Sequence, residues 1–220
     1  MKKFYLTLIL LASFTIQSKS QNLLTEDFLY QPVDSLENSG NWFRSGLNTE
    51  YNIKVASPGL VYPGNSGYGK GNSALIANAG NGDIVYHHFS KAVTSDAVYL
   101  SFLFRSDSLP TTLTQGTCIS FNPNTGATFH NTSLYIKRLS ENTFDLGIRK
   151  SEPIVYNNAV YQIGKTYLVV LKYTFLQGVD NDISSIYVFE NEVPKSEPAQ
   201  PHASSAQGED HPGQASVVLN

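Results

Sequence analysis

Gly64, Gly69 and Lys70 have the spacing of a phosphate-binding loop, G-x-x-x-x-G-K-[ST], and Gly69, Gly71 and Ala74 fit the dinucleotide pattern G-x-G-x-x-A. Both motifs need a buried strand before the loop and a helix after it, because backbone N–H groups at the start of that helix hold the phosphate. Here prolines interrupt the preceding segment, and Gly71 replaces the hydroxyl residue that would bind magnesium. We expect a glycine-rich surface loop over 64–71 that binds neither nucleotide nor phosphate.

Carboxylates are the groups that a glycan-cleaving enzyme would need. Such enzymes on a sandwich fold present an acid and a nucleophile together, as in E-x-D-x-x-E. No such run occurs: Glu26 and Asp27 are adjacent, so they point to opposite faces of a strand. Glu190, Glu192 and Glu197 enter a proline-rich segment that does not set their separation. No G-x-S-x-G elbow is present either. We therefore assign no catalytic residue.

Aromatic rings flanked by hydrogen-bonding side chains suit a carbohydrate, and this is the sharpest binding hypothesis that the residues offer. The candidate ligand-binding residues are Trp42, Tyr62 and Tyr68 in loops, with Tyr135, Lys137, Asp145, Arg149 and Lys172 on a mixed sheet face. The alternative for Trp42, the only tryptophan, is packing in the core, because large aromatic side chains are mostly buried. The alternative for the charged residues is an ordinary solvated outer face.

Calcium is the one metal ion that the sequence suggests. Asp180, Asn181 and Asp182 fall in one turn, and hard oxygen ligands of this kind suit Ca²⁺. Aspartate and asparagine are also the residues that any hairpin turn favours, so the turn alone explains them equally well. The acidic and histidine residues 209–211 lie in a loop without supporting residues, and we expect no metal there. No other cofactor is expected.

The elements that must position these residues are strands. Apolar and polar residues alternate over 97–106, 143–150 and 166–175, which is the period-2 pattern of half-buried strands. Tight polar turns at 140–143 and 178–184 predict hairpins. The expected fold is all-β, an antiparallel two-sheet jelly-roll sandwich.

The C-terminal part of the chain does not keep this alternation of apolar and polar residues throughout. Residues 191–214 are rich in proline and serine, which predicts a long surface loop with little packing. Residues 215–220 resume strand alternation. We therefore expect a sandwich domain over 21–190, a loop over 191–214 and a terminal strand over 215–220.

The first twenty residues predict export. Lys2 and Lys3 precede an apolar run over 4–16, and the small residues Ser18 and Ser20 follow. This is the pattern of a secretory signal peptide cleaved near Ser20, and the run is short for a membrane span. We expect a secreted or cell-surface protein without a membrane span in the mature chain.

The composition of the chain limits the classes of partner and of covalent cross-link that can be expected. The net charge of −3 includes no basic block, which argues against nucleic acid. Cys118 is the only cysteine, so the chain has no internal disulfide, and its apolar surroundings predict a buried thiol.

Several segments together resemble a known family. They are LLTEDFLY, VASPGLVYPGNSGYGKGNSALIANAGNGDIVYHHFS, VYLSFLFR, FDLGIRKS, GKTYLVVLKYTFLQGVDNDISSIYVF and PKSEPAQP. They are similar to the concanavalin A-like (LamG-like) jelly rolls of bacterial surface proteins exported by type IX secretion. The resemblance implies two antiparallel sheets packed face to face and carries over no catalytic signature. It also implies that a further strand and a sorting domain normally follow.

On that basis the sandwich is expected to lack its last strand and to leave an apolar-backed sheet edge unpaired, which favours self-association of residues 21–220. Fast hydrogen exchange is expected from Asn191 onward. The function that we expect is a non-catalytic binding or adhesion module that contacts polysaccharide or a surface glycan. The alternatives are a glycan-active hydrolase or lyase of the same fold and a structural spacer without a ligand.

Overall fold

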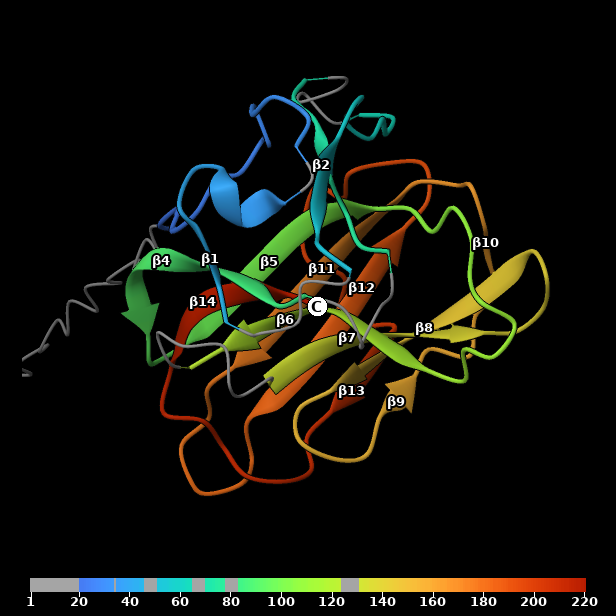
Figure 1. The fold of residues 1–220 in the computed structure, drawn as a ribbon. Helices are drawn as coiled ribbons and strands as arrows, with labels where there is room; N and C mark the ends of the chain where they lie inside the picture. Colours follow the sequence, from blue (N-terminus) through green and yellow to red (C-terminus); the bar gives the residue numbers. More distant parts are fainter. Residues whose placement is uncertain (1–19, 34, 46–50, 65–69, 78–82, 124–130) are drawn as a thin grey trace, which may run out of the picture.

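The structure is a computed structural model that describes residues 20–33, 35–45, 51–64, 70–77, 83–123 and 131–220. The described chain forms strands, with one short 3-10 helix, η1 (Leu36–Asn38). All pairings between the strands are antiparallel, and most of the strands form two sheets that pack face to face (Figure 1). The prediction of an all-β, antiparallel two-sheet jelly roll is confirmed.

The larger sheet has eight strands in the order β1-β4-β14-β6-β7-β8-β10, with β9 paired to β8. Its strands are β1 (Trp42–Arg44), β4 (Val85–Val93), β14 (Gln214–Leu219), β6 (Gly116–Asn122), β7 (Asn131–Arg138), β8 (Thr143–Arg149), β9 (Val155–Tyr156) and β10 (Tyr161–Gln162).

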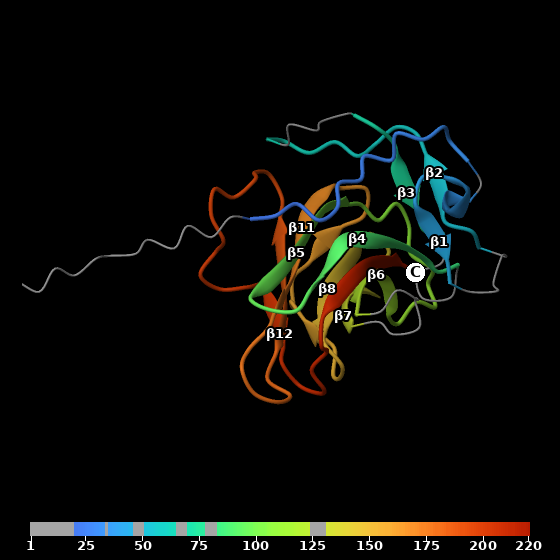
Figure 2. The same ribbon diagram turned by 90° about the vertical axis from the view of Figure 1, so that its left-hand side faces the viewer.

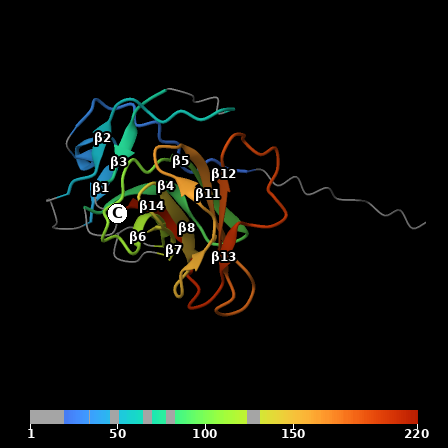
Figure 3. The same ribbon diagram turned by 90° about the vertical axis from the view of Figure 1, so that its right-hand side faces the viewer.

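The smaller sheet has four strands in the order β13-β12-β11-β5. They are β13 (Ala203–Ser205), β12 (Ile183–Phe189), β11 (Tyr167–Thr174) and β5 (Ala97–Phe104). A separate pair, β2 (Lys54–Ala56) and β3 (Ser73–Leu75), lies near β1 at one side of the sandwich (Figures 2 and 3).

The core lies between the two sheets, and the alternation in the sequence decides which side chains enter it. In β11 the fully buried side chains Tyr167, Val169 and Leu171 face the larger sheet. β11 pairs with β5, and in this register the inward residues of the two strands lie opposite each other, for example Val169 and Phe102. One face of each strand is thus apolar, as the period of two requires.

Both predicted hairpins are present. The β7–β8 turn closes with hydrogen bonds from the backbone N–H groups of Leu139 and Ser140 to the carbonyl oxygen of Thr143, at 3.0 and 3.2 Å. Residues 178–184 lie in the connection between β11 and the start of β12.

The segment over 191–214 differs from the surface loop that its composition predicts. It contains β13, which pairs with the edge of β12, and Ser205 in β13 is only 2% exposed. Gln214, fully buried, already begins β14. Proline and serine content reports local preference, whereas the free edge of β12 supplies hydrogen-bond partners that composition does not reveal.

The terminal strand is not at an edge. β14 pairs with β4 on one side and with β6 on the other, and Val217 and Leu219 point into the core. The C-terminus accordingly lies beside β6 and β14 near the centre of the view (Figure 1). The expectation of a loosely held terminal strand is therefore wrong, because both backbone edges of β14 are paired.

No helix in the described part of the chain is long and apolar enough to cross a membrane.

Candidate outer-face binding site

The outer face of the larger sheet brings several predicted binding residues into adjacent cross-strand rows. Tyr135 of β7 lies opposite Gly147 of β8, which lies opposite Tyr156 of β9. In the next row Lys137 lies opposite Asp145. Because alternate residues of a strand share a face, all of these side chains stand on the side away from the core.

Gly147 makes room for this arrangement. A Cβ at Gly147 would lie 2.9 Å from Cγ2 of Ile154 and 2.9 Å from Cδ1 of Tyr156. The missing side chain therefore lets the Tyr156 ring lie over β8. In this strand glycine serves close approach of another group, as is typical of glycine inside strands.

A cationic side chain lies over each of the two tyrosine rings. The Arg149 guanidinium lies 4.8 Å from the centre of the Tyr135 ring, and the Lys137 ammonium lies 3.9 Å from the centre of the Tyr156 ring. Both distances are within the range of cation–π attraction. Burial raises the pKa of Tyr135 and of Tyr156, so both phenols stay neutral at physiological pH.

Asp145 is the carboxylate that pairs with Lys137. Its side chain is 2% exposed, and Oδ2 lies 3.8 Å from Nζ of Lys137. Oδ1 accepts a hydrogen bond from the N–H of Leu146 at 2.8 Å, and Oδ2 accepts one from the N–H of Asn158 at 3.2 Å. Both oxygens are thus engaged, and Asp145 holds Lys137 above the sheet.

Three buried polar atoms in this region have no hydrogen-bond partner among the described residues: Ser133 Oγ, Arg149 Nε and Tyr156 OH. Ser133 lies opposite Arg149, one row from Tyr135 and Gly147. Buried polar atoms are nearly always satisfied in folded proteins, so a group of three asks for an explanation. We call Ser133, Tyr135, Lys137, Asp145, Arg149 and Tyr156 the outer-face patch.

Two other predicted sugar-binding aromatics are buried, as Tyr135 itself is at 6% exposure. Trp42 is 4% exposed at the start of β1, stacks on Phe28 and donates Nε1–H to Glu26 Oε2 at 2.9 Å. Tyr62 is fully buried and donates its hydroxyl to the carbonyl oxygen of Glu192 at 2.9 Å. Trp42 therefore takes the alternative of core packing, and Tyr62 lies in a loop as predicted but is buried; both side chains anchor the fold. Tyr68 lies outside the described residues, as do residues 1–19 of the predicted signal peptide.

Lys172 does not join the outer-face patch. It belongs to β11 in the smaller sheet, where its ammonium bonds Glu197 Oε1 at 2.7 Å.

A buried lysine from outside the predicted calcium turn contacts it. Lys150 is fully buried, and its ammonium donates to Asp210 Oδ1 at 2.6 Å and to the carbonyl oxygen of Asp182 at 3.1 Å. Asp182 accepts from the Tyr173 hydroxyl at 2.7 Å and from the Leu176 N–H at 2.7 Å. The Asp182 carboxylate thus already accepts from O–H and N–H donors, and its carbonyl oxygen contacts the Lys150 ammonium, which does not favour calcium at this turn.

Asp210 also accepts hydrogen bonds from the backbone N–H groups of Asn181 and Asp182, at 3.0 and 2.8 Å. Burial would raise the pKa of Asp210, but Lys150 and these N–H groups outweigh it and lower the pKa. No group of three or more metal-binding side chains occurs in the described part of the chain. Cys118 is buried, as predicted, and burial raises its pKa to about 12.

Sequence reasoning missed Ser133, Gly147 and Tyr156 as members of the patch. Ser133 was within reach, because it precedes Tyr135 by two residues and must share its face. Tyr156 could not be assigned to the patch from the sequence, because its position depends on how the chain returns after residue 150 to pair β9 with β8.

No protein-family model and no curated protein matches the chain. Solved structures with a similar fold include the globular domain of T. cruzi calreticulin, with 11% identity and a TM-score of 0.45 over 87% of this chain and 81% of that one. Another is the endo-β-1,4-glucuronan lyase of the fungus Trichoderma reesei, with 16% identity and a TM-score of 0.40 over 81% of this chain and 82% of that one. These likenesses are weak, and the fold is established by the pairing of the strands themselves.

Proposed function

We propose that the protein is a non-catalytic carbohydrate-binding module and that the outer-face patch contacts the sugar. The observation that supports this function is the group of three unpartnered polar atoms, Ser133 Oγ, Arg149 Nε and Tyr156 OH, beside two tyrosine rings. All three atoms are buried in this structure, so a ligand with hydroxyl groups would reach them only when side chains of the patch move aside.

The hydrogen-bonding character of the patch favours a polyol over a simple anion. The serine and tyrosine hydroxyls can each donate and accept, whereas the guanidinium Nε only donates. Sugar hydroxyls offer both roles at close spacing. The charges of Lys137 and Arg149 are partly balanced by Asp145 and by Glu152, whose Oε1 accepts from Arg149 Nη1 at 3.1 Å.

Binding without catalysis is favoured by the state of the carboxylates. Asp145 has both oxygens engaged by N–H groups, and Glu152 is bonded to Arg149. A general acid or base must reach the proton that it transfers, and Asp145, 2% exposed with both oxygens engaged, is not free to do so in this arrangement. A glycan-active enzyme is therefore the less favoured alternative. Export to the cell surface, by the type IX route that the resemblance implies, belongs to this proposal and rests on residues 1–20 and the quoted segments.

The test is a glycan array with residues 21–220, followed by calorimetric titration of the strongest ligand. Tyr156→Phe and Ser133→Ala each remove one unpartnered hydroxyl, and we expect a loss of affinity of about fivefold each, since one hydrogen bond is worth about 1 kcal/mol. Tyr99→Phe is the matched control: its hydroxyl lies on the smaller sheet and bonds Glu197 at 2.7 Å. Affinity should not change in this variant.

Two outcomes would refute the proposal. An array without any bound glycan would favour the structural spacer. A bound glycan whose affinity is unaffected by Tyr156→Phe and Ser133→Ala would move the binding site away from the patch.

A further inference from the structure

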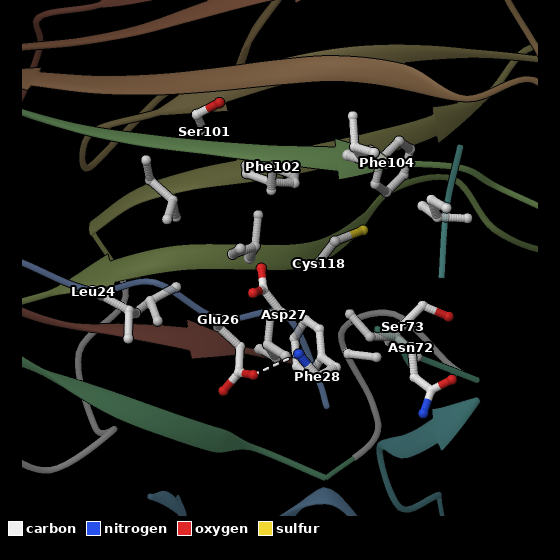
Figure 4. Close-up of a pocket in the computed structure, with 18 of the residues that line it drawn as sticks. Leu24, Glu26, Asp27, Phe28, Asn72, Ser73, Ser101, Phe102, Phe104 and Cys118 are labelled. Atoms are coloured by element: carbon white, nitrogen blue, oxygen red, sulfur yellow. Dashed lines mark hydrogen bonds between the residues drawn. The ribbon is translucent and has the colours of Figure 1, made fainter. Parts of the chain in front are cut away.

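A cavity of about 480 Å³ lies on the core side of the larger sheet, next to β5, the last strand of the smaller sheet. Figure 4 shows Phe102 and Phe104 of β5 and Cys118 of β6 on one side of it, and Leu24 and Phe28 on the other. The outer-face patch is on the opposite side of the larger sheet, so the two sites are separate.

The walls of the cavity are apolar. Side chains from both sheets contribute to them: Phe102, Phe104, Cys118, Ile119, Val217 and Leu219. Cys118, Val217 and Leu219 are buried members of the core, whereas Phe102 and Phe104 are only partly buried. The cavity therefore reaches from the core to the surface along β5.

Most of the polar residues that line the cavity come from two segments of the chain. Glu26 and Asp27 come from the N-terminal segment, and Lys70, Asn72 and Ser73 come from the segment that ends in β3. Asp27 and Lys70 are exposed and carry opposite charges. In Figure 4 Asn72 and Ser73 lie at one side of the cavity, Glu26 lies beside Phe28, and the Asp27 carboxylate points toward Cys118 and Phe102.

The space opens to solvent along β5, so it is a surface cavity and not a closed void of the core. Apolar walls offer water too few hydrogen bonds to hold it. The volume is within the range of ligand sites, roughly 300–1,000 Å³. An apolar guest would recover the dispersion contacts that the walls lack.

A sugar suits this cavity poorly, although Trp42 lines it. The indole is stacked on Phe28 and meets the edge of His87, which leaves no free ring face for a pyranose. The Glu26 carboxylate already accepts hydrogen bonds from Phe28 N–H, Tyr30 OH and Trp42 Nε1–H, at 2.6, 2.9 and 2.9 Å.

We propose that this cavity binds the hydrocarbon chain of a single-chain amphiphile, whose polar head stays at the rim formed by Asp27, Lys70 and Asn72. The chain lies against Phe102, Phe104 and Cys118. This inference goes beyond the proposed carbohydrate binding and does not depend on it.

The probe is sodium dodecanoate below its critical micelle concentration, titrated into residues 21–220 by calorimetry. Trp42 is the only tryptophan and lines the cavity, so its emission reports occupancy at the same time. We expect saturation at one dodecanoate per chain, with a change in Trp42 emission at the same midpoint. Ala74→Phe fills the cavity and should weaken binding at least tenfold. Leu75→Phe is the control, because Leu75 is the 44% exposed neighbour on the other face of β3.

If thermal unfolding shows that Ala74→Phe does not fold, Leu24→Phe replaces it, because Leu24 lines the cavity from a partly buried position. Absence of saturable binding would overturn the proposal. So would binding that the folded cavity-filling variant leaves intact, since dodecanoate would then lie elsewhere. Neither result affects the glycan test, which concerns the other face of the sheet.

Discussion

At the scale of single residues, Gly71 shows why the glycine-rich segment needs glycine. Its φ is +71°, and a Cβ there would collide with the carbonyl oxygen of Asp27. The N–H of Asn72 donates to that same oxygen at 3.2 Å. Gly71 thus lets two backbone segments meet, which is a structural use of the residue.

We predict that Gly71→Ala lowers the free energy of unfolding by about 2–3 kcal/mol, because positive φ and a backbone collision are combined. Gly164→Ala is the matched control: φ is +81°, but a Cβ there meets nothing within 4 Å. It should cost only about 1 kcal/mol, the strain of the backbone alone. Equal losses in urea denaturation would show that the contact with Asp27 is unimportant.

Lys150 is the residue whose removal should harm the fold most. Its buried ammonium joins Asp210 to the carbonyl oxygen of Asp182. Lys150→Met keeps the bulk but leaves the Asp210 carboxylate without its cation, and we expect a loss of about 3 kcal/mol.

The control for Lys150 is Lys165→Met, which breaks an ion pair with Glu190 whose side chains are 38% and 46% exposed. Such exposed pairs contribute about 0–1 kcal/mol. A loss for Lys150→Met no larger than for the control would contradict the importance of the buried pair.

At the scale of elements, Glu197 fastens the segment between β12 and β13 onto the outer face of the smaller sheet. Its oxygens accept hydrogen bonds from Lys172 at 2.7 Å, Tyr187 at 2.6 Å and Tyr99 at 2.7 Å. Burial would raise the pKa of this carboxyl, but the three donors outweigh it and lower the pKa to about 2.

A lowered pKa makes this contact pH-dependent. The stabilisation is fully present above pH 4.5, the ordinary value, and is lost as the pH falls through about 2. At pH 7 we expect Glu197→Gln to lower the free energy of unfolding by about 1 kcal/mol, allowing for solvent screening of a side chain that is 38% exposed. The difference between variant and parent should disappear near pH 2. A difference that stays constant from pH 7 to pH 2 would show that the charge of Glu197 is not responsible.

The position of β14 reverses the expectation of fast exchange at the C-terminus. Val217 and Val218 pair with β4 on one side and β6 on the other. Amide hydrogens of central strands exchange only by large openings. We predict that amides of β14 that bond to these neighbours exchange as slowly as those of β6, measured by hydrogen–deuterium exchange and NMR. Exchange within minutes over 216–219 would mean that the strand detaches.

At the scale of the whole molecule, β14 joins two halves of the larger sheet. β1 and β4 lie on one side of it, and β6 to β10 lie on the other. We predict that deletion of residues 214–220 abolishes cooperative unfolding of the domain instead of trimming an edge, because the core loses Val217 and Leu219 and the sheet is divided. Thermal unfolding followed by circular dichroism checks this. A deletion variant that still unfolds in one sharp transition would contradict it.

The free edges of the molecule lie elsewhere. β5 ends the smaller sheet and runs for eight residues, and it borders the cavity. Among the described residues, β5 pairs with β11 on one side only. Such an edge invites pairing with another chain, so self-association of residues 21–220 stays a prediction, now placed at β5 instead of at the C-terminus.

The sequence by itself determined the class of the fold and the direction of many side chains. Alternation is a local property, so Val98, Leu100, Phe102 and Phe104 could be assigned to the core and Tyr135, Asp145 and Arg149 to one outer face. The period of a strand needs no knowledge of its neighbours.

Only the tertiary structure decided which strands meet. Lys150 pairs with Asp210, 60 residues away, and Tyr156 joins the cross-strand row of Tyr135 only because β9 returns to β8 at Gly147. Trp42 and Tyr62 became buried anchors because Glu26 and the Glu192 carbonyl lie within hydrogen-bond distance in space. The order and register of strands depend on contacts between distant segments, and those contacts leave no local pattern in the residues that make them.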